Sequence, residues 1–171
     1  GTGNAVRLER LKIAGGDEAD GDDGGGIDFA GAGTLYLTHM EISGNSAENG
    51  GVLAVRYGFS TIATLGPDVR IIGNTARANG GGIHVRYGVL RADADQIYIG
   101  FNHAPNGLGG GIDVRYTTQV DLGSPGFGTL PMLHANDALY GGAIAVSAGT
   151  LSALPGRVRL YSTDATRPVR I

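Results

Sequence analysis

The chain has 171 residues, of which 32 are glycine and 6 are proline, and its formal net charge is −3. The glycines neither recur at every third position, as in collagen, nor form serine-rich runs, as in flexible linkers. The acidic balance argues against binding to nucleic acid, and the absence of cysteine excludes disulfide scaffolds, thiol nucleophiles and cysteine zinc sites.

Short segments with alternating apolar residues recur along the chain. Five of them begin at the last residue of a Gly-Gly-x-Ile/Leu motif. The two apolar residues of each segment are Ile27 and Phe29, Leu53 and Val55, Ile83 and Val85, Ile112 and Val114, and Ile144 and Val146. Alternation with period two, bounded by Gly, Asn and Asp, is typical of short strands. Helical repeats would need 3.6-residue spacing and few glycines, so the pattern predicts strands over most of the chain.

A second motif, Ile/Leu-x-x-Asn-x-Ala, precedes the later copies of the first. Its asparagines are Asn45, Asn74, Asn102 and Asn136, and degenerate copies occur at 13–16 and 160–165. Both motifs recur about every 29 residues. Such registered repetition of two linked motifs is the signature of a solenoid in which each repeat forms one structural unit.

Three short strands and three turns account for a repeat of this length. We therefore predict an all-β, right-handed parallel β-helix of about five coils, with residues 1–171 in a single domain and successive coils about 4.8 Å apart. The four asparagines should lie in one buried column and hydrogen-bond to one another, with left-handed backbone angles available to them at the turn. The paired glycines should allow positive φ and close approach of stacked backbones.

The Gly-Gly-Ala-Ile sequence at 141–144, together with the apolar-x-x-Asn motif, resembles the repeats of the chlamydial polymorphic outer-membrane proteins. The same pattern is similar to the β-helical passenger regions of other bacterial surface proteins. The resemblance covers nearly the whole chain, although Ile or Leu stands where that family usually has Phe. It implies an exported bacterial protein, secreted or at the outer membrane, with a role in adhesion or autotransport.

Outward positions of the Gly-Gly-x strands form two predicted columns. One contains Asp28, His84 and Asp113; the other contains Arg56, Arg86 and Arg115, which are followed by Tyr57, Tyr87 and Tyr116. Stacked arginines repel, so each needs an anion or an aromatic partner. Two interpretations remain open. The arginines bind an acidic glycan, a lipid phosphate or an acidic host or cell-surface protein, or they stack on the tyrosines and pair with Asp28 and Asp113.

An acidic turn at 17–23 could hold Ca²⁺. The turn carries Asp17, Asp20, Asp22 and Asp23, and carboxylate oxygens are the ligands that Ca²⁺ prefers. The spacing does not follow the calcium loop of EF-hands, so a solvated turn is the alternative. No other cofactor is expected.

Catalysis is the least favoured of the possible functions. Asp28 and Asp113 lie three coils apart, about 14 Å, whereas glycosidases bring two carboxylates within about 10 Å. Asp93, Asp95 and Asp121 have Arg91 beside them, and His84 lacks a nucleophile or oxyanion site. The sequence therefore predicts a non-catalytic binding or display module. A fragment of a polysaccharide-processing enzyme and a structural spacer are the alternatives.

The ends of the predicted solenoid carry no obvious capping segment. A coil without a cap exposes strand edges and its apolar interior. This predicts either end-to-end self-association or a piece of a longer rod. No stretch reaches the roughly 18 apolar residues that a membrane-spanning helix needs.

Overall fold

Strands are the only regular elements in the part of the chain that the structure describes. The computed structural model describes residues 4–18, 21–56, 61–92, 94–116, 119–123 and 131–147, and the backbone of Arg157–Leu160. Within these ranges no helix is long and apolar enough to cross a membrane.

The strands form four parallel sheets. Sheet A contains β1 (Asn4–Glu9), β4 (Gly33–Thr38), β8 (Thr61–Leu65), β12 (Val89–Ala92), β16 (Gln119–Leu122) and β20 (Arg157–Leu160). Sheet B contains β2 (Lys12–Ala14), β5 (Met40–Ser43), β9 (Val69–Ile72), β13 (Tyr98–Gly100) and β17 (Met132–His134). Sheet C contains β6 (Ser46–Asn49), β10 (Thr75–Asn79), β14 (His103–Leu108) and β18 (Asp137–Tyr140). Sheet D contains β3 (Ile27–Ala30), β7 (Leu53–Arg56), β11 (Ile83–Arg86), β15 (Ile112–Arg115) and β19 (Ile144–Ser147).

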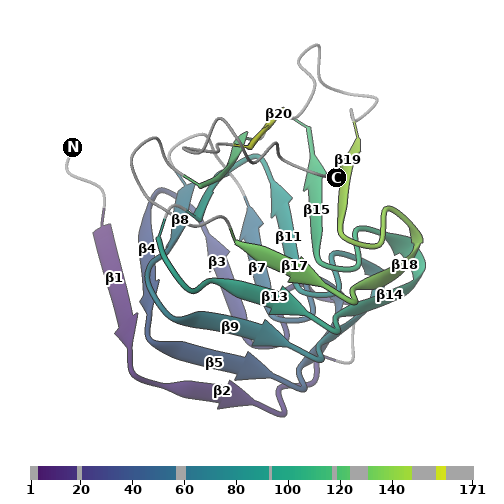
Figure 1. Cartoon of the computed structure of the whole chain (residues 1–171), viewed down its shortest axis with the longest axis horizontal. Helices are drawn as coiled ribbons and strands as arrows, with labels where there is room; N and C mark the ends of the chain where they lie inside the picture. Colours follow the sequence, from purple (N-terminus) through teal and green to yellow (C-terminus); the bar gives the residue numbers. More distant parts are fainter. Residues whose placement is uncertain are drawn as a thin grey trace, which may run out of the picture.

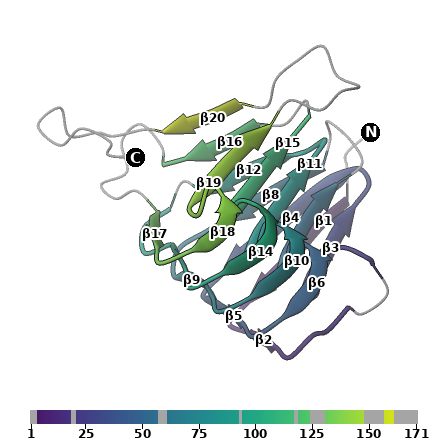
Figure 2. The same cartoon turned by 90° about the vertical axis from the view of Figure 1, so that its right-hand side faces the viewer.

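The chain visits sheets A, B, C and D in turn, and each circuit adds one coil (Figures 1 and 2). Four coils have all four strands, namely β4–β7, β8–β11, β12–β15 and β16–β19. In the coil before them, isolated bridges from Asp17 to Ser46 and from Asp23 to Asn49 take the place of a sheet C strand. This arrangement confirms the predicted all-β parallel solenoid with a repeat of about 29 residues.

The expectation of three strands per coil was wrong, because the asparagine motif contains a corner. The residue before each asparagine has a left-handed backbone, with φ of 63° at Gly44, 64° at Gly73, 56° at Phe101 and 48° at Ala135. One left-handed residue bends the chain sharply and ends a strand, so sheets B and C meet at this corner. The asparagines themselves are not the left-handed residues, contrary to the sequence-based expectation.

The interior is built from aliphatic columns. Register pairing aligns Ile42, Ile71 and Ile99 on sheet B and Leu53, Ile83 and Ile112 on sheet D, and all six are fully buried. Val85 and Val114, predicted to point inward, are also fully buried. Each residue packs on its equivalent in the next coil, so the thin core repeats along the axis. Figure 2 shows the strands of each sheet stacked along that axis.

A ladder of asparagine amides runs through the B–C corner. Asn45 Nδ2 donates to Asn74 Oδ1 at 3.1 Å, Asn74 Nδ2 to Asn102 Oδ1 at 2.9 Å, and Asn102 Nδ2 to Asn136 Oδ1 at 2.9 Å. Each of these acceptor oxygens also receives the backbone N–H of the preceding asparagine in the ladder. The ladder therefore satisfies buried polar groups that no water reaches, which explains why Asn recurs at this position.

The two glycines of each pair serve different needs. Gly80, the first of its pair, has φ of 66°, whereas a Cβ on Gly81, the second, would lie 2.5 Å from the carbonyl oxygen of Gly110 in the next coil. The first glycine thus supplies a left-handed turn, and the second allows neighbouring backbones to approach closely.

Candidate binding surface

The outer side of sheet D carries the two predicted columns. Parallel register places His84 between Ala54 and Asp113, and places Arg86 between Arg56 and Arg115. Tyr57 lies outside the described residues. The three arginines are therefore stacked in adjacent coils, as the spacing predicted, but their surroundings differ from one coil to the next.

Arg56 is held by two carboxylates of the preceding coil. Its Nε donates to Asp28 Oδ1 at 2.8 Å and its Nη2 donates to Asp28 Oδ2, a bidentate pair. Its Nη1 also lies 3.2 Å from Asp23 Oδ2. A guanidinium with two anionic partners has its charge compensated within the protein.

Arg115 and His84 share one carboxylate. Arg115 Nε donates to Asp113 Oδ2 at 2.7 Å, and its Nη2 donates to Asn79 Oδ1. His84 Nδ1 lies 2.9 Å from the same oxygen of Asp113. Asp113 Oδ2 therefore lies within hydrogen-bonding distance of both the His84 ring and the Arg115 guanidinium.

Two residues of the predicted outward column, His84 and Asp113, are buried. Asp113 is 0% exposed and His84 is 3% exposed, and Asp113 Oδ1 has no hydrogen-bond partner. They do lie on the outer side of the sheet, but the Arg115 side chain, which reaches Asn79, covers the carboxylate. Asp113 therefore holds Arg115 within the arginine column.

A second polar column was not foreseen from the sequence. Asn79 Nδ2 donates to Asn49 Oδ1 at 2.8 Å, and Asn49 Nδ2 donates to Asp23 Oδ1 at 2.8 Å. Each residue directly precedes a Gly-Gly pair, and the equivalent positions in later coils are Leu108 and Tyr140. This shared position before the Gly-Gly pair is the sequence signal from which the second polar column could have been predicted. Two side chains of this column contact the arginines: Asp23 pairs with Arg56, and Asn79 accepts a hydrogen bond from Arg115.

Arg86 has a different environment from its two neighbours. It is exposed, and its guanidinium carbon lies 5.0 Å from the ring centroid of Tyr116 and 5.7 Å from that of Tyr87. The two rings stack with centroids 4.7 Å apart and planes 9° apart. Both tyrosines have positive φ, 57° and 60°, so the backbone holds the rings in the same orientation.

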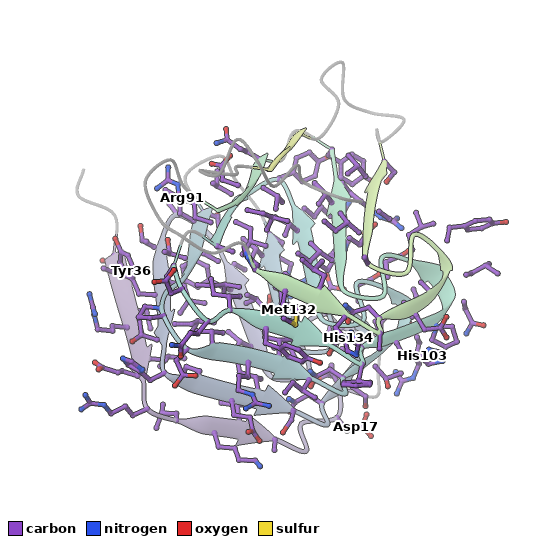
Figure 3. The ribbon with its side chains drawn as sticks, viewed as in Figure 1. Asp17, Tyr36, Arg91, His103, Met132 and His134 are labelled. Carbon is purple, nitrogen blue, oxygen red and sulfur yellow. The ribbon has the colours of Figure 1, made fainter. Side chains whose placement is uncertain are left out.

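Among the described residues of the acidic turn, Asp17 and Asp23 each have separate partners on the neighbouring coil. Asp17 accepts a hydrogen bond from Ser46 at the start of β6 and lies 3.7 Å from Arg77, on the outside of the solenoid (Figure 3). Asp23 pairs with Asn49 at the end of that strand, Asp22 is exposed, and Asp20 lies outside the described residues. No group of three metal-ligating side chains occurs among the residues described.

The remaining histidines and acids are dispersed. His103 lies 3.0 Å from Asp137 on sheet C, and His39 lies 3.7 Å from Asp68. Figure 3 shows His103 on the opposite side of the solenoid from Arg91 on sheet A. Asp121 accepts a hydrogen bond from Gln119, and Asp93 lies outside the described residues. Within the described ranges these groups form local pairs.

Comparison with known proteins identifies one segment of the chain. A family model of the Chlamydia polymorphic membrane protein repeat matches residues 68–86, which contain Asn74, the Gly80-Gly81 pair and the strand ending at Arg86. No curated protein and no solved structure matches the chain significantly. The match confirms the resemblance drawn from the two motifs. The chain thus carries a polymorphic outer-membrane-protein-like repeat in a parallel β-solenoid.

Proposed function

We propose that the chain is a non-catalytic binding module of an exported bacterial surface protein, of the adhesin or autotransporter passenger type. The observation that carries this proposal is the in-register outer column of sheet D. There, Asp28 holds Arg56 and buried Asp113 holds Arg115, and exposed Arg86 lies between these two arginines on a regular, otherwise architectural solenoid. An ordered row of charged side chains on a rigid scaffold suits recognition of a repetitive or extended ligand.

The alternative of a polysaccharide-processing enzyme receives less support. Asp28 and Asp113 are separated by three strand spacings, about 14 Å, which exceeds the separation of catalytic carboxylates in glycosidases. Each of them is hydrogen-bonded to an arginine, so each carboxylate already has a partner within the protein.

The alternative of a structural spacer differs from a binding module in one measurable respect. A binding module retains specific cells or surface molecules, whereas a spacer of the same shape retains none. The experiment immobilises the purified solenoid and measures its retention of host cells, cell-surface proteins and neutral and acidic polysaccharides. Saturable retention of at least one of them supports the proposal, and the absence of saturable retention across the whole panel contradicts it.

The same preparation tests the enzyme alternative. Acidic and neutral polysaccharides incubated with the solenoid should keep their length distribution and gain no reducing ends or unsaturated products. Cleavage that scales with the concentration of the folded solenoid would favour the enzyme. End-to-end self-association, the other predicted partner interaction, is tested by light scattering over a range of concentrations.

A further inference from the structure

Two neighbouring positions on sheet D can supply a carboxylate to an arginine of the sheet D column. One is the residue two positions earlier on its own strand, and the other is that same position one coil earlier. Arg56 has Ala54 at the first and Asp28 at the second, and Asp28 holds it. Arg115 has Asp113 at the first, and Asp113 holds it.

Arg86 finds no acid at either position. The residue two positions earlier on its own strand is His84, and the residue at that position one coil earlier is Ala54. Among the described residues no carboxylate lies within 4.0 Å of Arg86, and its neighbours at the surface are the stacked rings of Tyr87 and Tyr116. Arg86 is thus the arginine of this column whose charge remains available to an external anion.

We propose that Arg86, flanked by Tyr87 and Tyr116, binds an acidic polysaccharide through the carboxylate of a uronic acid. This inference rests on the proposed binding function and specifies its ligand class. A guanidinium offers two parallel N–H groups that match a carboxylate. The tyrosine hydroxyls add hydrogen-bonding groups for sugar hydroxyls, and the ring carbons add apolar surface for the C–H groups of a pyranose.

The charges around Arg86 favour a polysaccharide over an acidic protein surface. Asp23 and Asp28 both lie two coils below Arg86, on the same outer side of the solenoid, and the whole chain carries a net charge of −3. A dense acidic patch on a protein would be repelled by these groups. A polyuronate carries one carboxylate per sugar, so a single carboxylate can reach Arg86 while hydroxyl groups contact the rest of the surface.

The fold provides a matched set of variants. Arg86→Gln removes the charge directly. Ala54→Asp leaves Arg86 in place but adds a carboxylate at the position from which Asp28 holds Arg56, so it supplies an internal competitor for the ligand. Ala145→Asp adds the same charge to the same column two coils away from His84, and Arg70→Gln removes an exposed arginine beside Tyr98 on sheet B.

The experiment measures binding of defined galacturonic acid oligosaccharides to the whole chain by calorimetry at low salt. Methyl esters of the same oligosaccharides remove the carboxylate, and polyglutamate supplies carboxylates without sugar. We expect Arg86→Gln and Ala54→Asp each to weaken galacturonate binding by about tenfold, the effect of one charged hydrogen-bonded pair. Arg70→Gln and Ala145→Asp should change it by less than about twofold, and the esters should bind at least about tenfold more weakly.

Several outcomes would overturn this assignment while leaving the broader proposal testable. Absence of galacturonate binding, equal binding of the methyl esters, equal or tighter binding of polyglutamate, or equal losses in Arg86→Gln and Arg70→Gln would each contradict it. Because Ala54 is fully buried, melting temperatures of all variants are compared, and Arg86→Gln decides the outcome if Ala54→Asp does not fold. Failure of the proposed function is a separate result, namely no saturable retention of any cell, protein or polysaccharide.

Discussion

Asn74 Nδ2 donates to Asn102 Oδ1 at 2.9 Å, and both side chains are completely buried at the same corner of adjacent coils. The Asn74 amide also donates to the carbonyl oxygen of Ile42 at 3.1 Å, and its Oδ1 receives two hydrogen bonds from Asn45. One side chain therefore joins three coils. Within such a ladder every amide depends on its neighbours, since each acceptor oxygen belongs to the next coil.

Asn74→Ala should strongly destabilise the solenoid. The substitution leaves the backbone N–H of Asn45 and the carbonyl of Ile42 without these partners in a dry environment, at about 1–3 kcal/mol for each group. We expect a loss of about 3 kcal/mol in the free energy of unfolding, measured by urea denaturation. Asn136→Ala, at the half-buried end of the ladder, is the control and should lose about 1 kcal/mol because Asn102 Nδ2 keeps its bond to Ile71. Equal losses in both variants would contradict the ladder as a source of stability.

Gly81→Ala should be far more damaging than Gly73→Ala. A Cβ on Gly81 would lie 2.5 Å from Gly110 O and 2.6 Å from the backbone nitrogen and oxygen of His103, and none of these backbone atoms can move independently of its coil. We expect a loss of at least about 3 kcal/mol or failure to fold.

Gly73 is the matched control because it has a left-handed backbone, φ 64°, but open space around its Cβ position. Its equivalents Phe101 and Ala135 already have side chains at similar φ. Gly73→Ala should therefore cost about 1 kcal/mol, the strain of one left-handed residue. Circular dichroism melts of both variants measure the difference. A similar melting temperature for both would show that the coils can separate to admit a methyl group.

The repeat allowed the inward columns and the order of the coils to be predicted, because every coil places equivalent residues in the same environment. Ile83 and Ile112 follow from alternation alone, and the recurrence of Asn74 and Asn102 fixes their column. The four-stranded coil could not be foreseen in this way. Phe101 and Ala135 carry no sequence signal for a left-handed backbone, so the corner that separates sheets B and C is visible only in the structure.

The burial of His84 and Asp113 shows a second limit of pattern analysis. Alternation tells which side of a sheet a residue faces, and it correctly places both on the outer side. It does not tell whether another segment covers that side. Here Arg115 spans the distance between Asp113 and Asn79, two residues 34 positions apart, and no local pattern encodes that contact.

Asp113→Ala should destabilise the protein much more than Asp28→Ala. Asp113 is fully buried and is a carboxylate partner of both Arg115 and His84, so its removal leaves these two side chains without that partner in a largely buried site. The expected loss is about 3–5 kcal/mol. Asp28 is 35% exposed on its side chain, and Arg56 retains Asp23 when Asp28 is lost, so that variant should lose less than about 1 kcal/mol.

Chemical denaturation of the two aspartate variants, with Arg115→Met as a third, provides the measurement. The double variant Asp113→Ala with Arg115→Met should be more stable than Asp113→Ala alone, because it removes the guanidinium that has lost its anion. If the double variant were less stable by the sum of the single losses, the two residues would act independently, and the network would not be the cause.

The pair of Lys12 and Glu41 makes a prediction for the dependence of stability on pH. Lys12 Nζ lies 2.8 Å from Glu41 Oε1 in paired positions of β2 and β5. The hydrogen bond from Lys12 and its positive charge hold the pKa of Glu41 below the ordinary value of 4.5, with a smaller contribution from the charge of Arg70. Since the folded pKa is the lower one, folding favours the ionised form. The contribution to stability is fully present above about pH 4.5 and is lost as the pH falls through the folded pKa.

Lys12→Met should raise the pKa of Glu41 towards its ordinary value, whereas Arg70→Gln should raise it less, because Arg70 acts through its charge alone. Carbon-13 NMR titration of the Glu41 carboxyl measures the pKa in both variants. The stability difference between the wild-type chain and Lys12→Met should be constant from pH 5 to pH 8 and should shrink at lower pH, as Glu41 takes up a proton in both chains. A larger rise in Arg70→Gln than in Lys12→Met, or a stability difference that grows on acidification, would contradict the assignment of this shift to the β2–β5 ion pair.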